Sequence, residues 1–164
     1  KLAVFELPDL HAKFMLYRLD KNIFLHVIND EVYFISPLDN HVYVYSKEGI
    51  FIKDIELKIP SFNKFSEDIN LNSDIREIMK KASDLFSKKS YIYSSFQINA
   101  GTLLLVVSHK DHNYELIYFD TEKEEIIKSE AAENLPAYAK DDKLYFVRPT
   151  KENFKIIEQE LSYN

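Results

Sequence analysis

The feature that most constrains this chain is a series of short runs in which aromatic and β-branched residues alternate. The first two runs, residues 32–35 (VYFI) and 42–45 (VYVY), are separated by Pro37-Leu38-Asp39-Asn40. β-Branched and aromatic residues favour strands, whereas Pro, Asp and Asn favour turns. This pattern predicts antiparallel strands joined by short connections, and therefore an all-β fold.

One of the chain's two glycines, Gly49, ends the turn Ser46-Lys47-Glu48-Gly49 between residues 42–45 and a run that begins at Ile50. A type I turn followed by a residue at positive φ closes a tight hairpin with a G1 bulge. Glycine takes that conformation at little steric cost. Gly49 is therefore expected to serve the backbone of the hairpin.

The same pattern returns in the second half of the chain, and the strand-like runs fall into three groups of about 45 residues. The groups span residues 24–57, 91–130 and 135–161. In the last two groups, strands are expected at residues 91–93, 102–107, 114–119, 126–127, 137–139, 143–147 and 154–157. We therefore predict a partial β-propeller of about three four-stranded antiparallel blades within a single domain, residues 1–164, with a β-sandwich as the alternative.

Residues 74–88 interrupt the strand pattern with a helical period. Apolar side chains recur on one face, and Asp74 with Glu77 resembles a capping box. This pattern predicts an amphipathic helix inserted between the first and second blades. It is expected to cover its own domain, with a partner-binding helix as the alternative.

Residues 39–53, DNHVYVYSKEGIFIK, resemble the middle of an NHL-type propeller repeat. More narrowly, the chain resembles the six-bladed β-propeller lipoproteins of Bacteroidetes, which also carry helical insertions between blades. The resemblance covers residues 23–57 well and residues 91–130 more loosely, and it includes no catalytic signature. It implies part of a six-bladed ring, lipid-anchored outside the cytoplasm in its full-length form.

Three blades make about half of such a ring, which leaves the faces of the two terminal blades open. Residues 3–7 and 14–19 are expected to belong to a preceding blade. The chain opens with Lys1 rather than Met, so we expect a mature form or a fragment from which any targeting segment is missing. We expect the open faces to be covered by self-association or by the remainder of a longer chain.

Composition narrows the classes of function. The formal net charge is −6, with Lys and Arg interleaved among Asp and Glu, which argues against a nucleic-acid partner. The chain has no Cys, and this excludes disulfides, thiol catalysis and cysteine-ligated zinc. It also has no apolar run of the ~20 residues that a membrane-spanning helix needs.

One loop offers a candidate metal site. His109, Asp111 and His112 provide two imidazoles and a carboxylate, the ligands that zinc accepts. A polar turn is needed at the same place, so a plain loop is the competing interpretation. The remaining histidines (His11, His26, His41) are expected in strands or turns, and the aspartates Asp39, Asp120, Asp141 and Asp142 at turns.

Several tyrosines could stack on a sugar if they lay on one face of a propeller: Tyr33, Tyr43, Tyr45, Tyr93, Tyr118 and Tyr145. Because Tyr43 and Tyr45 share one face of a strand, packing between blades is the favoured interpretation.

The sequence predicts no cofactor and no catalytic residue. The leading hypothesis is a non-enzymatic module that binds a protein or glycan. The alternative is an enzyme of cell-envelope glycans, in which His109, Asp111, His112 or Asp39 would converge in one pocket.

Overall fold

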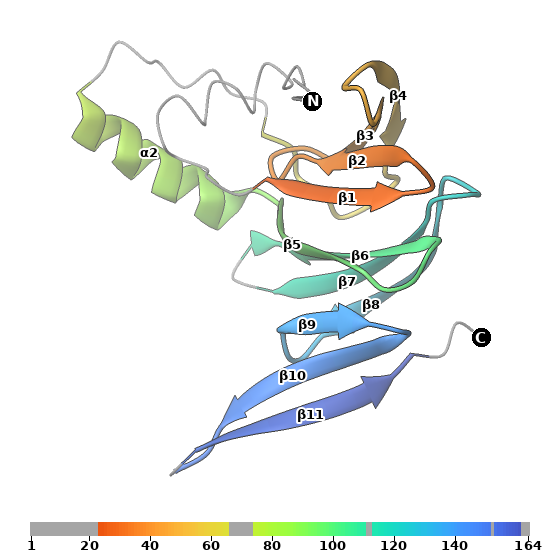
Figure 1. Ribbon diagram of the computed structural model, residues 1–164. Helices are drawn as coiled ribbons and strands as arrows, with labels where there is room; N and C mark the ends of the chain where they lie inside the picture. The colour runs from red at the N-terminus through yellow and green to blue at the C-terminus, as the bar shows by residue number, and fades with distance from the viewer. Residues whose placement is uncertain (1–22, 66–73, 111–112, 152, 162–164) are drawn as a thin grey trace.

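The computed structural model describes residues 23–65, 74–110, 113–151 and 153–161, and within them the chain forms three antiparallel sheets and one helix (Figure 1). Sheet 1 consists of β1 (Phe24–Ile28), β2 (Glu31–Ile35), β3 (His41–Ser46) and β4 (Phe51–Glu56). Sheet 2 consists of β5 (Tyr91–Gln97), β6 (Thr102–Ser108), β7 (Tyr114–Asp120) and β8 (Glu125–Ala132). Sheet 3 consists of β9 (Tyr138–Lys140), β10 (Lys143–Pro149) and β11 (Phe154–Glu160).

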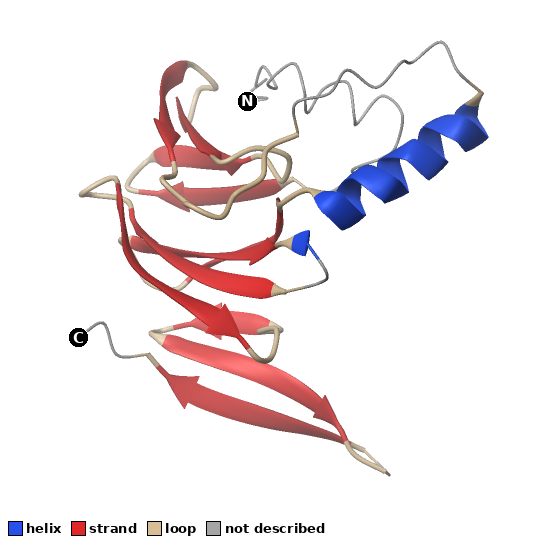
Figure 2. Ribbon diagram, turned by 180° about the vertical axis from the view of Figure 1, so that it is seen from behind, coloured by secondary structure: helices blue, strands red, loops and turns tan. Residues whose placement is uncertain are grey.

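Each sheet is a meander in which consecutive strands pair, and the three sheets are stacked one upon another (Figures 1 and 2). The β1–β2, β3–β4, β5–β6, β7–β8 and β9–β10 turns lie at one end of the stack, which we call the turn end. The connections β2–β3, β4–β5, β6–β7, β8–β9 and β10–β11 lie at the opposite end, which we call the helix end because α2 (Ile75–Lys88) is part of it.

Sheet 2 lies in the middle of the stack, and both of its faces are covered. All seven residues of β6 are buried, as a continuous apolar strand requires. Leu103, Leu105 and Val107 pack against sheet 1, whereas Leu104 and Val106 pack against sheet 3. Sheet 1 contributes mainly Tyr33, Ile35, Val42, Val44 and Ile55 to the first interface, and sheet 3 contributes Ala139, Leu144 and Phe146 to the second.

The turns confirm the predicted backbone chemistry. Gly49 has a φ of 89°, its N–H donates to the Ser46 carbonyl oxygen at 2.9 Å, and the Ser46 N–H donates to the Ile50 carbonyl oxygen at 2.8 Å, as in a hairpin with a G1 bulge. The β7–β8 turn places Glu124 at a φ of 57°. Asp141 and Asp142, predicted to form a turn, both have positive φ, which is the type I′ geometry that suits a two-residue hairpin.

The helix predicted over residues 74–88 is present as α2. The Asp74 carboxylate accepts a hydrogen bond from the Arg76 N–H at 2.8 Å, so Asp74 caps the first turn. Near the last turn, the ring of Phe86 lies 5.2 Å from that of Phe65 and 5.2 Å from that of Tyr91, both edge-to-face. No helix in the described ranges is long and apolar enough to cross a membrane.

The strand groups match three sheets, but the third differs from the prediction of four strands. Sheet 3 has three described strands, because residues 133–137 form a connection and the unit contains only three strand-like runs. The prediction of a fourth strand extends the pattern of the first two units to the third. The three stacked layers also differ from the two of the sandwich alternative. Residues 3–7 and 14–19, assigned to a preceding blade, lie outside the described residues.

Candidate functional site at the helix end

His109, one of the predicted metal ligands, lies just after β6 and joins two segments of the chain. Its Nδ1 lies 3.0 Å from the Ser90 Oγ, and its Nε2 lies 2.9 Å from the Glu115 Oε2. The Ser61 hydroxyl donates to the same Glu115 oxygen at 3.2 Å. The Asn63 N–H donates to the Ser90 Oγ at 3.0 Å. The network therefore holds the segment that follows β4 against the helix end of sheet 2.

Ser90, His109 and Glu115 have the composition of a hydrolytic relay, in which a histidine links a serine to a carboxylate. A nucleophilic serine must reach its substrate, and Ser90 is 2% exposed. Its hydroxyl also lies 3.4 Å from the Ser61 carbonyl oxygen. Because Ser90 is buried and hydrogen-bonded, we interpret it as a structural residue that joins these segments and not as a nucleophile.

The metal prediction is tested only at His109. Asp111 and His112 lie outside the described residues, so their geometry relative to His109 stays a prediction. Both nitrogens of His109 are occupied by Ser90 and Glu115. Among the residues that the structure describes, no group of three or more His, Cys, Asp or Glu side chains is arranged to hold a metal ion.

Asp39, the other residue considered for acid–base chemistry, lies in the β2–β3 connection. Its carboxylate accepts hydrogen bonds from the His41 N–H at 3.0 Å and from the Tyr43 hydroxyl at 2.9 Å. Burial raises the pKa of Asp39, and it also raises the pKa of Tyr43. The ring of His41 stacks on Tyr43, and its Nδ1 lies 3.2 Å from the Asp54 carboxylate.

Asp39 and His109 therefore have separate sets of partners, and no hydrogen bond joins them. Asp120 acts as predicted at its turn: its Oδ1 accepts the N–H groups of Glu122 and Lys123, each at 2.9 Å. The described polar groups thus satisfy neighbouring backbone and side chains, and they do not converge on one reaction centre.

His26 lies in β1 and hydrogen-bonds across the first interface, with its Nε2 2.7 Å from the Ser95 Oγ of β5. Burial lowers the pKa of His26 to about 4. The residue is therefore neutral at pH 7 and serves as a packed hydrogen-bonding group. His11 lies outside the described residues.

The tyrosines divide into two groups. Tyr33, Tyr45 and Tyr118 are buried and act in packing. Tyr93 is 44% exposed, and its ring lies edge-to-face with that of Tyr114 at 5.6 Å. Tyr43 and Tyr45 share a face of sheet 1 as expected, but it is the face turned away from sheet 2, since Val42 and Val44 meet sheet 2.

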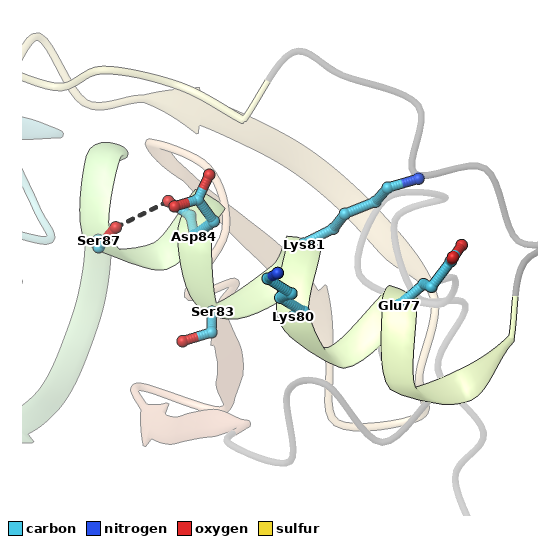
Figure 3. A pocket seen from close by; sticks show the side chains of 6 residues that line it. All are labelled: Glu77, Lys80, Lys81, Ser83, Asp84 and Ser87. Atoms are coloured by element: carbon cyan, nitrogen blue, oxygen red, sulfur yellow. Dashed lines mark hydrogen bonds between the residues drawn. The ribbon is translucent and has the colours of Figure 1, made fainter.

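A hollow of about 840 Å³ lies beside α2, and its described lining residues are Glu77, Lys80, Lys81, Ser83, Asp84 and Ser87 (Figure 3). These residues all come from one helix, and their charges are of both signs. Lys88 pairs with Asp84 at 2.6 Å, and the Ser87 hydroxyl donates to the Asp84 carbonyl oxygen. This surface is the solvated face of an amphipathic helix, and no second described element brings functional groups toward it.

A smaller cleft of about 230 Å³ lies between sheets 2 and 3, where their strands separate toward the helix end. Its apolar floor comes from Leu116 of β7, Phe146 of β10 and Ile157 of β11. Arg148 and Glu133 are among the polar residues that line it. Unlike the hollow beside α2, this cleft receives side chains from two sheets.

The outer face of sheet 3, turned away from sheet 2, is apolar and exposed. Val147 lies directly opposite Ile156, and Tyr145 lies opposite Tyr138, so these four side chains point to one side together with Phe154. Phe154 is 75% exposed and Ile156 is 69% exposed. We use the name outer face of sheet 3 for these five residues: Tyr138, Tyr145, Val147, Phe154 and Ile156.

Sequence reasoning missed the Ser90–His109–Glu115 network and the charged groups of the cleft. The signal for Arg148 was present in LYFVRP, where strict alternation places Arg148 on the same face as the buried Leu144 and Phe146. No comparable local signal marks Ser90, because its partners come from two distant segments, residues 61–63 and His109.

Comparisons with known proteins give no relative for this chain: no family model, no curated protein and no solved structure matches it.

Proposed function

We propose that this protein is a non-enzymatic binding module built as part of a β-propeller, and that it binds another protein through the outer face of sheet 3. The observation that carries this proposal is the exposure of Phe154 and Ile156. They lie on a sheet face that has the same kinds of apolar side chain as the buried faces between the sheets. Contiguous exposed apolar surface on a soluble domain marks interaction sites.

The propeller interpretation is supported by how the sheets meet. The first strands of successive sheets contact each other, β1 with β5 and β5 with β9. In a propeller, the first strand of each blade lies nearest the axis, where neighbouring blades are closest. Together with the resemblance of residues 39–53 to NHL-like repeats, this arrangement favours blades of a larger ring. The same resemblance is our reason to propose an extracytoplasmic location.

The occupant that we propose for the outer face of sheet 3 is another apolar sheet face, packed as sheets 1 and 2 pack against each other. Both internal interfaces join sheet faces of aliphatic and aromatic side chains. The outer face of sheet 3 continues this stack with the same residue types. In a solution of this chain alone, a second copy is the available source of such a face.

The experiment is light scattering on the 19.4 kDa chain across a wide concentration range. We expect concentration-dependent dimers, which the double variant Phe154→Ser and Ile156→Thr returns to monomers. A matched control, Val27→Thr with Ile50→Ser, replaces apolar side chains in β1 and in the β3–β4 turn that are 64% and 67% exposed, and it should leave dimers intact. A monomer at every concentration, or equal effects of both pairs, would contradict the proposal.

The described residues give the enzyme alternative little support. That hypothesis required His109 and Asp39 to meet in one pocket, and each is bonded to different partners. The nearest arrangement to a catalytic relay includes a serine that is 2% exposed. A binding role therefore accounts better for the exposed surfaces and for the closed polar networks.

A further inference from the structure

The wall that sheet 3 gives to the cleft carries one positive charge, Arg148, and a second positive charge lies beside it on the same face of the sheet. In β10, Leu144 and Phe146 pack against sheet 2, and alternation along the strand places Arg148 on the same face. Lys155 of β11 lies directly opposite Arg148, so the two side chains share this face of sheet 3. Like charges at directly opposed positions destabilise a sheet.

Neither cation is neutralised by the described part of the chain. Arg148 and Lys155 are both exposed, and neither forms an ion pair with a described carboxylate. Their neighbours differ in this respect, since Lys143 in the same sheet pairs with Glu158 at 2.6 Å. Arg148 and Lys155 are therefore two adjacent positive charges without a described carboxylate partner, in a chain with a formal net charge of −6.

The opposite wall carries an unpaired negative charge. Glu133 follows β8, lines the cleft and is exposed without an ion pair. The other carboxylate of this wall, Glu130, is already held by the Tyr118 hydroxyl at 2.7 Å and by Lys128 at 3.1 Å. Glu133 and Arg148 therefore face one cleft at a separation too long for an ion pair.

We propose that this cleft binds a small zwitterion with an apolar side chain, which is the chemistry of a free aliphatic α-amino acid. A guanidinium binds a carboxylate in a bidentate manner, so Arg148 would hold the ligand carboxylate while Lys155 adds a second positive charge. Glu133 would hold the ammonium group. Leu116, Phe146 and Ile157 form an apolar floor for the ligand side chain.

Size and electrostatics agree with this ligand class. The volume of about 230 Å³ lies below the range of ~300–1,000 Å³ that is typical of drug-sized ligands, so the cleft suits a molecule the size of one amino acid. A ligand carboxylate between Arg148 and Lys155 also relieves their mutual repulsion. The cleft is on the face of sheet 3 opposite the proposed protein-binding face, so the two proposals stand independently.

The test is a titration of the ¹⁵N-labelled protein, followed by amide chemical shifts, with three probes of one shape: L-leucine, 4-methylpentanoate and 3-methylbutylamine. We expect L-leucine to bind with a dissociation constant of about 1 mM or lower, with 4-methylpentanoate weaker and the amine weakest. The shifts should centre on residues 130–134, Arg148 and Gln159. If no probe shifts these amides, or if the amine binds as well as L-leucine, the proposal is overturned.

Three variants test which charged side chain binds which group of the ligand, and the same spectra verify that each variant is folded. Arg148→Gln should weaken both L-leucine and 4-methylpentanoate about tenfold or more. Glu133→Gln should weaken L-leucine and leave 4-methylpentanoate unchanged or tighter. Lys151→Gln removes a positive charge from the same hairpin outside the cleft, and it should change neither affinity. If Arg148→Gln and Lys151→Gln weakened binding equally, the ligand would be attracted by the overall positive charge of the hairpin. That result would contradict a specific site at Arg148.

Discussion

The two interfaces between the sheets differ in how they are joined. Sheets 1 and 2 share an apolar core and polar links at both ends: Ser61 with Glu115 at the helix end, and Lys53 with Glu124 at the turn end. Sheets 2 and 3 share a smaller apolar core and a turn-end hydrogen bond from Asn99 to Asp142 at 2.7 Å, and at the helix end they separate into a cleft. Polar links at both ends keep two twisted sheets closed, and an interface linked at one end can open at the other.

The largest test of this contrast compares two fully buried leucines. Leu105→Ala in the first interface and Leu144→Ala in the second should each cost about 2–5 kcal/mol through lost burial and a residual cavity. We expect Leu105→Ala to lower the free energy of unfolding of the whole domain. Leu144→Ala should first release sheet 3, seen as faster hydrogen exchange in residues 138–160 than in residues 24–56. If Leu144→Ala accelerated hydrogen exchange equally in both ranges, the two interfaces would not differ in the way that we propose.

A second test uses pH, because His26 lies in the first interface. Its pKa is about 4 in the folded chain against 6.5 for the ordinary group, so the folded state resists protonation. Above pH 6.5 His26 is neutral in both the folded and the unfolded chain, so it does not lower the free energy of unfolding. As the pH falls from 6.5 to 4, His26 becomes protonated in the unfolded chain but stays neutral in the folded chain. The free energy of unfolding therefore falls by up to about 3 kcal/mol.

Urea unfolding at a series of pH values measures this loss. His26→Asn keeps a hydrogen-bonding group and cannot titrate, so it should flatten the stability profile between pH 6.5 and 4. His41→Asn, in the same sheet but paired with Asp54 near the surface, serves as the control. If the control flattens the profile as much as His26→Asn, the loss does not arise in the first interface.

The smallest test removes one polar link from each interface region. Ser90→Ala leaves the Asn63 N–H and a nitrogen of His109 without their partner in a buried place, which should cost about 1–3 kcal/mol. Asn99→Ala breaks the exposed hydrogen bond to Asp142 and the local one from the Gly101 N–H to the Asn99 Oδ1, and it should cost about 1 kcal/mol. Thermal unfolding of the two variants measures the difference, and a larger loss in Asn99→Ala would reverse our assignment of the stronger link.

Local chemistry was enough to predict most of the elements. The hairpin at Gly49, the turn at Asp141 and Asp142, and the helix capped by Asp74 follow from preferences that neighbouring residues express alone. The strand count of the third sheet was wrong because it was inferred by analogy with the first two groups. The β7–β8 turn was predicted from Asp120, but the positive φ of Glu124 within it was not, since a glutamate does not mark positive φ as a glycine does.

The candidate sites depended on register and on contacts between distant segments. Arg148 and Lys155 become neighbours only once the β10–β11 hairpin sets which residues oppose each other. The Ser90–His109–Glu115 network forms only when the segment after β4, the residue before β5 and the β6–β7 connection lie close together. Patterns within one strand do not carry that information.

The strand order has a consequence for how the protein is made. In the described part of the chain every paired strand is the sequence neighbour of its partner. Contacts between segments close in sequence form quickly, because little chain entropy is lost in closing short loops. Each sheet can therefore assemble soon after its last strand leaves the ribosome, and the next sheet grows onto a surface that is already in place.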